Sequence, residues 1–199
     1  MICCVTGNRP KSFPFPYDED DLYFNTYRGV LDETVEDLIY EGYTHFISGM
    51  AAGVDLDFAS TVFDLSGNFE GIILESALPY SWTPPEKMSN IDDMRDFLID
   101  VSQIKTVVSP QYFRGCMQKR NRYMVDKADL VLAVWNGEMR GGTWYTINYA
   151  IKKGKPIRYI MLNELSLKDK EKHFDRLSLS FEIKERLKKE EDLYPNEYI

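Results

Sequence analysis

The chain has few of the residues that carry metal, disulfide or acid–base chemistry. Its 199 residues include 3 cysteines and 2 histidines. Cys3 and Cys4 are adjacent, so within a strand their side chains face opposite ways, and Cys116 is remote from both. No metal-ligand spacing is present, and an odd number of cysteines argues against a disulfide framework. We therefore predict no metal site, no nucleophile–base pair and no redox role for the thiols.

Long apolar runs are also missing. No segment reaches the length of a membrane-spanning helix, and Asn8-Arg9-Pro10 interrupts the first apolar run, which argues against a signal peptide. We therefore expect a soluble, cytoplasmic protein that does not cross a membrane. The chain is 44% hydrophobic, which is enough for a sizeable core without metals or disulfides.

Basic residues are outnumbered. Lysine and arginine total 24 against 32 aspartate and glutamate residues, for a formal net charge of -8. Broad nucleic-acid binding requires clustered lysine and arginine, so nucleic acid is not an expected partner. A small local anion site is still compatible with this balance, because local charge can oppose the overall sign. The composition leaves the oligomeric state open, a homodimer included.

Short apolar segments alternate with segments of helical periodicity along most of the chain. The expected strands are residues 1–6, 45–48, 71–77, 105–109, 130–135 and 157–162, and the expected helices are 21–41, 55–64, 91–102, 115–127 and 143–153. Near-continuous apolar strands alternating with helices predict an α/β fold, a Rossmann-like three-layer sandwich with a mostly parallel sheet and helices on both faces. We assign residues 1–165 to this domain and 166–199 to a charged helical extension.

Three glycine-containing turns follow predicted strands: Thr6-Gly7-Asn8-Arg9, the segment from Ser48 to Asp55, and Arg140-Gly141-Gly142-Thr143. A strand that ends in such a turn and leads into a helix directs backbone N–H groups at the turn, where an anion can bind. Small residues also let a ligand approach the backbone closely. Because ligands of open α/β sheets bind beyond the carboxyl ends of the strands, the three turns are predicted to share one site.

The first turn offers the Thr6 hydroxyl, backbone N–H groups near Gly7, and Arg9, whose guanidinium can hold a phosphate with two hydrogen bonds. The alternative is that Gly7 serves the turn alone and Arg9 is solvated. In the third turn, Gly141, Gly142 and Thr143 precede a helix expected to start at or just after the threonine. Thr143 then either contributes to a phosphate site or simply caps the helix.

The second turn contains Ser48, Gly49, Gly53 and Asp55. A tight connection between strand and helix explains the glycines without a ligand. Asp55 stands where a helix N-cap is preferred, and the competing role is acceptance of a hydrogen bond from a ribose hydroxyl. We favour capping for Asp55 and ligand contact for the backbone from Gly49 to Gly53.

For several other residues, the sequence allows both a role in ligand binding and a purely structural role. Glu75, near the end of the third strand, is either a polar ligand contact or a surface carboxylate. The basic helix 115–127 favours a solvated face, although Arg120 or Asn121 could turn toward the ligand edge. Aromatic rings that could stack on a base, or else simply pack, are Tyr80, Trp82 and Trp144. His45, at a strand start, is expected to be packed.

Four segments resemble the YpsA-like proteins of unknown function in the SLOG superfamily, which are related to the DNA-processing protein DprA and to the LOG (Lonely Guy) proteins. These segments are Thr6 to Arg9, Ser48 to Asp55, Asn121 to Asp129 and Gly141 to Thr143. The resemblance spans roughly Met1 to Leu162. It implies a Rossmann-like fold with a nucleotide pocket formed by Gly7, Arg9, Ser48, Gly49, Gly53, Gly141, Gly142 and Thr143.

The sequence departs from the LOG enzymes, which cleave the N-glycosidic bond of nucleoside monophosphates with a Pro-Gly-Gly-x-Gly-Thr-x-x-Glu motif. Here Met139-Arg140 precede the glycines, and Thr146 stands in place of the glutamate. The chain is therefore expected to bind or sense a nucleotide or nucleotide derivative, such as an ADP-ribose-like or NAD-like molecule, without requiring a cofactor. The alternatives are a nucleotide N-glycosidic hydrolase that uses Glu75 or Asp55, and a partner-binding regulatory module.

Overall fold

The computed structural model describes residues 1–165, so the predicted extension 166–199 lies outside the described residues. Strands are β1 (Ile2–Gly7), β2 (His45–Ser48), β3 (Ile73–Leu78), β4 (Ile104–Val107), β5 (Leu130–Trp135) and β6 (Ile157–Met161). Helices are α1 (Leu22–Tyr40), α2 (Val54–Ser66), α3 (Asn90–Val101), α4 (Cys116–Lys127) and α5 (Gly141–Lys152), with a 3₁₀ turn at Pro10–Ser12. The predicted alternation of strands and helices is confirmed.

The strands form one sheet in the order β4-β3-β2-β1-β5-β6, and every described pair is parallel. This confirms the predicted Rossmann-like α/β architecture. The chain moves outward from β1 through β2, β3 and β4 on one side, and then returns to place β5 and β6 on the other. The carboxyl ends of β1 and β5 therefore flank the point where the winding reverses, which is where such sheets bind ligands.

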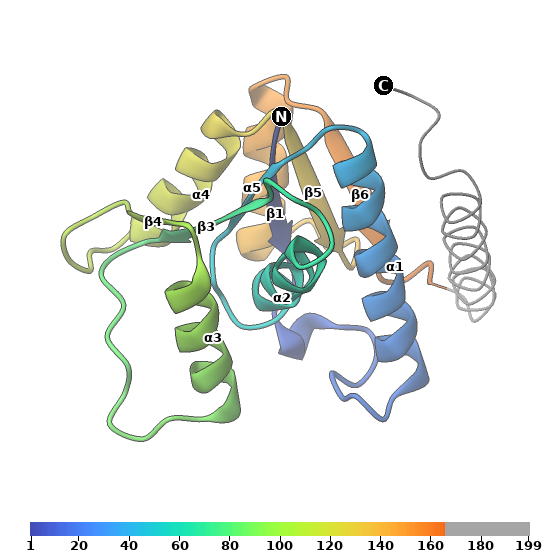
Figure 1. Cartoon of the computed structure of the whole chain (residues 1–199), viewed down its shortest axis with the longest axis horizontal. Coiled ribbons are helices and arrows are strands. Elements are labelled where there is room, and N and C mark those ends of the chain that lie inside the picture. Colours follow the sequence, from blue (N-terminus) through green and yellow to red (C-terminus); the bar gives the residue numbers. More distant parts are fainter. Residues whose placement is uncertain (166–199) are drawn as a thin grey trace, which may run out of the picture.

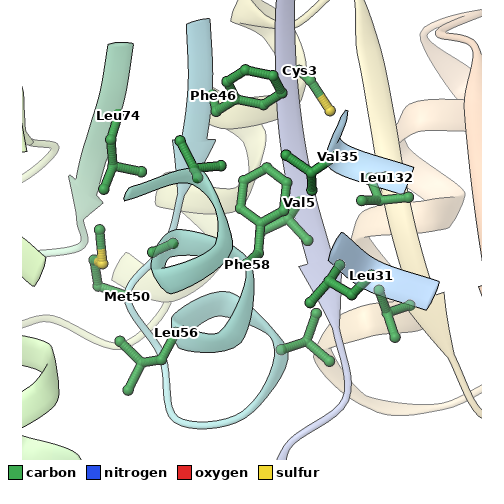
Figure 2. Packing of buried hydrophobic residues seen from close by; sticks show 14 of the residues in the cluster. Cys3, Val5, Leu31, Val35, Phe46, Met50, Leu56, Phe58, Leu74 and Leu132 are labelled. Atoms are coloured by element: carbon green, nitrogen blue, oxygen red, sulfur yellow. The ribbon is translucent and has the colours of Figure 1, made fainter. Parts of the chain in front are cut away.

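Two hydrophobic clusters cover the two faces of the sheet. The larger contains residues of α1, α2 and α3, and the smaller contains residues of α4 and α5, so the helices divide three to two between the faces (Figure 1). In the larger cluster, Leu31 and Phe58 pack from the helices against Val5 and Phe46 of the strands (Figure 2). No helix among residues 1–165 is long and apolar enough to cross a membrane.

The adjacent cysteines confirm the strand alternation. Cys3 belongs to the larger cluster and Cys4 to the smaller, so their side chains point to opposite faces. Both thiols and that of Cys116 are free and buried. Burial raises the pKa of Cys3 to about 12, so this thiol stays protonated and packs as a small apolar group.

Candidate functional site

A pocket of about 240 Å³ lies at the carboxyl end of β1, where the first turn of α2 meets residues of α4 and of the start of α5. The structure brings six of the predicted site residues to its wall: Thr6, Gly7, Arg9, Asp55, Gly142 and Thr143. The other five do not line it: Ser48, Gly49, Gly53, Glu75 and Gly141. The turns after β1 and β5 therefore meet at one site, and the turn after β2 contributes through Ala51 and Asp55.

Gly7 allows α2 to pack directly on the end of β1. A Cβ at Gly7 would lie less than 3.0 Å from three side-chain atoms of Val54, the first residue of α2. The Gly7 carbonyl accepts a hydrogen bond from Thr143 Oγ1 at 2.8 Å, which joins this turn to α5. Close packing therefore accounts for the glycine, and Arg9, two residues further on, is exposed at the pocket wall.

Two asparagines that the sequence did not single out hold the turn that carries Arg9. The Asn8 side chain accepts a hydrogen bond from the Asn136 backbone N–H at 3.0 Å, and Asn136 Nδ2 donates to the Ser12 carbonyl at 3.0 Å. The Asn8 carbonyl also accepts from the Val54 N–H. These contacts join the loops after β1 and β5 to the start of α2, so the backbone that carries Arg9 is fixed from both sides.

In the turn after β2, the polar and glycine residues serve the connection itself. Ser48 Oγ donates to the Asp55 carbonyl at 2.6 Å and accepts from the Met50 N–H. Gly53 has a φ of 93°, and a Cβ there would lie 2.7 Å from the Asn8 carbonyl oxygen. Of the segment from Gly49 to Gly53, only Ala51 lines the described pocket, and ligand contact along the rest of this backbone stays a prediction.

Asp55 is not the helix cap that the sequence favoured. The cap position belongs to Gly53, α2 begins at Val54, and no side chain in the described part of the chain caps it. Asp55 instead lies within the first turn, where its Oδ2 accepts from the Ala51 N–H at 3.4 Å and faces Arg120. The sequence placed the cap two residues too late in the chain. α2 begins directly after the glycine turn, so Asp55 is already a helical residue.

Arg120 reaches from α4 to the start of α2 and pairs with Asp55. Its Nη1 lies 3.3 Å from Asp55 Oδ2, and the two residues are 5% and 9% exposed. Its guanidinium lies directly over Gly49, where any Cβ would collide with it. Burial raises the pKa of Asp55 and lowers that of Arg120, and in each case the partner's charge opposes the shift.

The prediction of a solvated basic face is thus wrong for Arg120, and the sequence held a signal for its burial. Cys116 and Met124 lie four residues before and after Arg120, so helical spacing places all three on one face. All three are buried. Asn121 also lines the pocket, where its Nδ2 donates to Thr146 Oγ1 at 2.7 Å.

The first turn of α5 is open toward the pocket. The helix begins at Gly141, two residues earlier than expected, and no side chain of residues 1–165 caps it. Thr143 does not cap it either, because its hydroxyl donates to Gly7. A Cβ at Gly142 would meet no atom of residues 1–165 within 4 Å. The uncapped N–H groups of this turn are therefore available to an anion, in a space that glycine leaves open.

Glu75 lies in a separate polar cluster, and its description as a surface carboxylate is wrong. Its side chain is fully buried. It accepts hydrogen bonds from Tyr123 at 2.5 Å, Lys127 at 2.7 Å and Thr106 at 2.8 Å, and its other contact is with His45 Nε2 at 2.6 Å. Through these hydrogen bonds the cluster connects α4 to β2, β3 and β4. His45 is packed, as expected.

The candidate stacking residues lie away from the pocket wall. The Trp82 ring faces the Arg95 guanidinium at 4.7 Å, and its Nε1 donates to Asp96. Trp144 stacks on Trp135, with ring centroids 5.5 Å apart. Both indoles therefore already pack against protein groups, which agrees with the packing alternative.

The sheet and the position of the pocket define a doubly wound α/β protein with a crevice at the reversal of its strand order. Comparison with known families makes this specific: the YspA SLOG family matches residues 3–165, so the chain belongs to that family. The family resemblance predicted from the glycine turns is thereby confirmed.

Individual relatives agree with this assignment. A UPF0398 protein of Bacillus velezensis is 21% identical over 184 residues, covering 87% of this chain and 98% of the relative. The UPF0398 protein YpsA of Bacillus subtilis is 23% identical, covering 82% and 94%. An uncharacterized SPbeta prophage-derived protein, YoqJ, of Bacillus subtilis is 31% identical over 131 residues, covering 59% and 76%.

Proposed function

We propose that this protein binds a nucleotide or nucleotide derivative, such as an ADP-ribose-like or NAD-like molecule, with a phosphate group in the pocket at β1. The observation that carries the proposal is the meeting of two cations, Arg9 and Arg120, with the uncapped first turn of α5. Among residues 1–165, Asp55 is the single carboxylate in this wall, so the charged groups that these residues contribute sum to one positive charge in a chain of net charge -8. Such a setting favours an anion.

The size of the pocket indicates which part of the ligand it encloses. At about 240 Å³ it is smaller than the roughly 300–1,000 Å³ of most small-molecule sites. We expect a phosphate and its sugar to be enclosed, with the base at the mouth. Family membership agrees with a nucleotide-related role.

Thermal unfolding in the presence of adenosine monophosphate, ADP-ribose and NAD tests the proposal. At 100 times its Kd, a ligand of the native state adds about 2.7 kcal/mol to stability, which corresponds to roughly 5–10 °C in Tm for a chain of this size. Arg9→Ala is expected to weaken binding about 10- to 100-fold, since hydrogen bonds to charged groups contribute about 1.5–3 kcal/mol.

The matched control is Arg122→Ala, which removes the same charge from an exposed residue of α4 outside the pocket wall. It should leave binding unchanged. If none of the three compounds raises Tm at large excess, the proposed function is wrong.

Asp55 also keeps a second candidate function open, the N-glycosidic hydrolysis of a nucleotide. Its carboxylate lines the pocket and could stabilise an oxocarbenium-like sugar, whereas Glu75 is enclosed in its own cluster. Thr146, at the position of the LOG glutamate, lies in the pocket wall and donates to the Gly142 carbonyl. Hydrolysis predicts release of free base from nucleoside monophosphates or NAD by the wild type and loss of that release in Asp55→Asn. Chromatography that detects no free base with the wild type would exclude this function.

A further inference from the structure

The guanidinium of Arg120 is incompletely satisfied although it is buried. A guanidinium has five N–H donors. Within residues 1–165 its Nε has no hydrogen-bond partner, and its contact with Asp55 is 3.3 Å long. Charge-assisted hydrogen bonds of this kind usually span about 2.7–2.9 Å. Arg120 therefore retains capacity for an acceptor, and it lines the pocket.

The ion pair of Asp55 and Arg120 is not exclusive, because both residues also interact with other groups. Asp55 Oδ2 is shared between Arg120 and the Ala51 N–H. The charge of Arg9 acts on both members of the pair. The Asp55 carboxylate and a phosphate in the same pocket would therefore face the same two cations.

We propose that Asp55 is an internal competitor for the anion at Arg120: its carboxylate and the phosphate of the ligand bind the same guanidinium. This inference rests on the proposed function, because it concerns the anion that the pocket binds. Asp55 then weakens the binding of every anion at this site. An anion binds only if it displaces the carboxylate from Arg120 or shares the guanidinium with it. A strongly charged phosphate meets this condition better than a singly charged carboxylate ligand.

The proposal predicts an unusual result, a loss of charge in a binding site that strengthens binding. Asp55→Asn should tighten the binding of inorganic phosphate and of ribose 5-phosphate about tenfold, which is within the range expected on removing one like charge some 4 Å away. If Asp55 instead accepts a hydrogen bond from a ribose hydroxyl, the same variant weakens ribose 5-phosphate and leaves phosphate unchanged. Isothermal titration calorimetry with both compounds separates the two roles.

Asp57→Asn is the matched control. Asp57 lies two residues further along α2 and is also buried, but it accepts from Tyr17 and Tyr27 and faces Arg28, outside the pocket wall. It should not change phosphate affinity. In a second arm, the gain from Asp55→Asn should vanish in the Arg120→Gln background, because the contested guanidinium is then absent.

The outcomes separate this inference from the proposed function. If the wild type binds ribose 5-phosphate and Asp55→Asn binds neither compound more tightly, the competition is overturned and the pocket assignment stands. If neither protein binds either compound although a nucleotide raises Tm, the competition is overturned and the proposed function stands; if no nucleotide raises Tm either, both fail. Should Asp55→Asn not fold, phosphate titrated into the ¹⁵N-labelled wild type replaces it. A shift of the Arg120 Nε–H resonance is then expected, and its absence overturns the proposal.

Discussion

Replacing Gly7 with alanine is expected to lower the free energy of unfolding by about 3 kcal/mol, near the upper end for overpacking a core. The added Cβ would collide with Val54, which is fully buried in the larger hydrophobic cluster. Val54 can yield only if α2 moves, and that would also disturb the Thr143 hydrogen bond to Gly7. Urea unfolding measures the loss, and Tm should fall by roughly 6–12 °C.

Gly142→Ala is the control for this prediction. Gly142 lies in the first turn of α5, and a Cβ there would meet no atom within 4 Å in the part of the chain that the structure describes. The change should alter stability by no more than about 1 kcal/mol, in the direction of the higher helix propensity of alanine. It should nevertheless weaken nucleotide binding, because the methyl group enters the pocket. Equal stability of the two variants would contradict the packing role of Gly7.

Glu75→Gln is expected to cost about 3 kcal/mol of stability at pH 7 and to change the response to acid. Burial alone would raise the pKa of Glu75, but hydrogen bonds from His45, Lys127, Tyr123 and Thr106 outweigh it and lower the pKa to about 2 from an ordinary value of 4.5. A shift of this size corresponds to about 3 kcal/mol between the two protonation states.

The direction of the pH dependence follows from that lowered pKa. The unfolded glutamate takes up its proton near pH 4.5, whereas the native one stays ionised to about pH 2. The stabilisation is therefore complete above pH 4.5 and is lost as the pH falls from 4.5 to 2. Between pH 4.5 and pH 2, the free energy of unfolding should fall more steeply with decreasing pH for the wild type than for Glu75→Gln.

Glu138→Gln provides the comparison. This carboxylate pairs with Arg140 at the surface, where solvent screens the interaction, and no measurable change is expected. If Glu75→Gln matched the wild type at both pH 7 and pH 3, the hydrogen-bonded cluster would contribute nothing to stability.

The sequence predicted the α/β fold well because that information is local. Apolar strands, helical spacing and glycine turns are each read within ten or twenty residues, and together they specify a parallel sheet with helices on both faces. The same reasoning brought the turns at Gly7 and Gly142 to one edge, since carboxyl ends of parallel strands share it. Helix starts were less well predicted, because α2 and α5 begin at glycine turns where no described residue supplies a capping side chain.

The electrostatics of the site could not be predicted in the same way. Asp55 and Arg120 are 65 positions apart, and their pairing depends on α4 lying across the end of the sheet from α2. The partners of Glu75 come from β2, β4 and α4, and the nearest of them in the chain, His45, is 30 positions away. Such contacts depend on which elements become neighbours, and a single sequence does not encode that as a local pattern.

The sequence by itself determined the fold class and the edge of the sheet where the turns after β1 and β5 meet, because both follow from periodicity and turn chemistry. It also determined the family, through the likeness of its motifs to those of known members. Only the tertiary structure decided what the turn residues do there. It showed that Gly7 and Gly49 make room for Val54 and Arg120, that Gly142 faces open space, and that Asp55 pairs with a buried guanidinium. The physical reason is that close packing and charge pairing act between atoms brought together by the whole fold, whereas propensity acts along the chain.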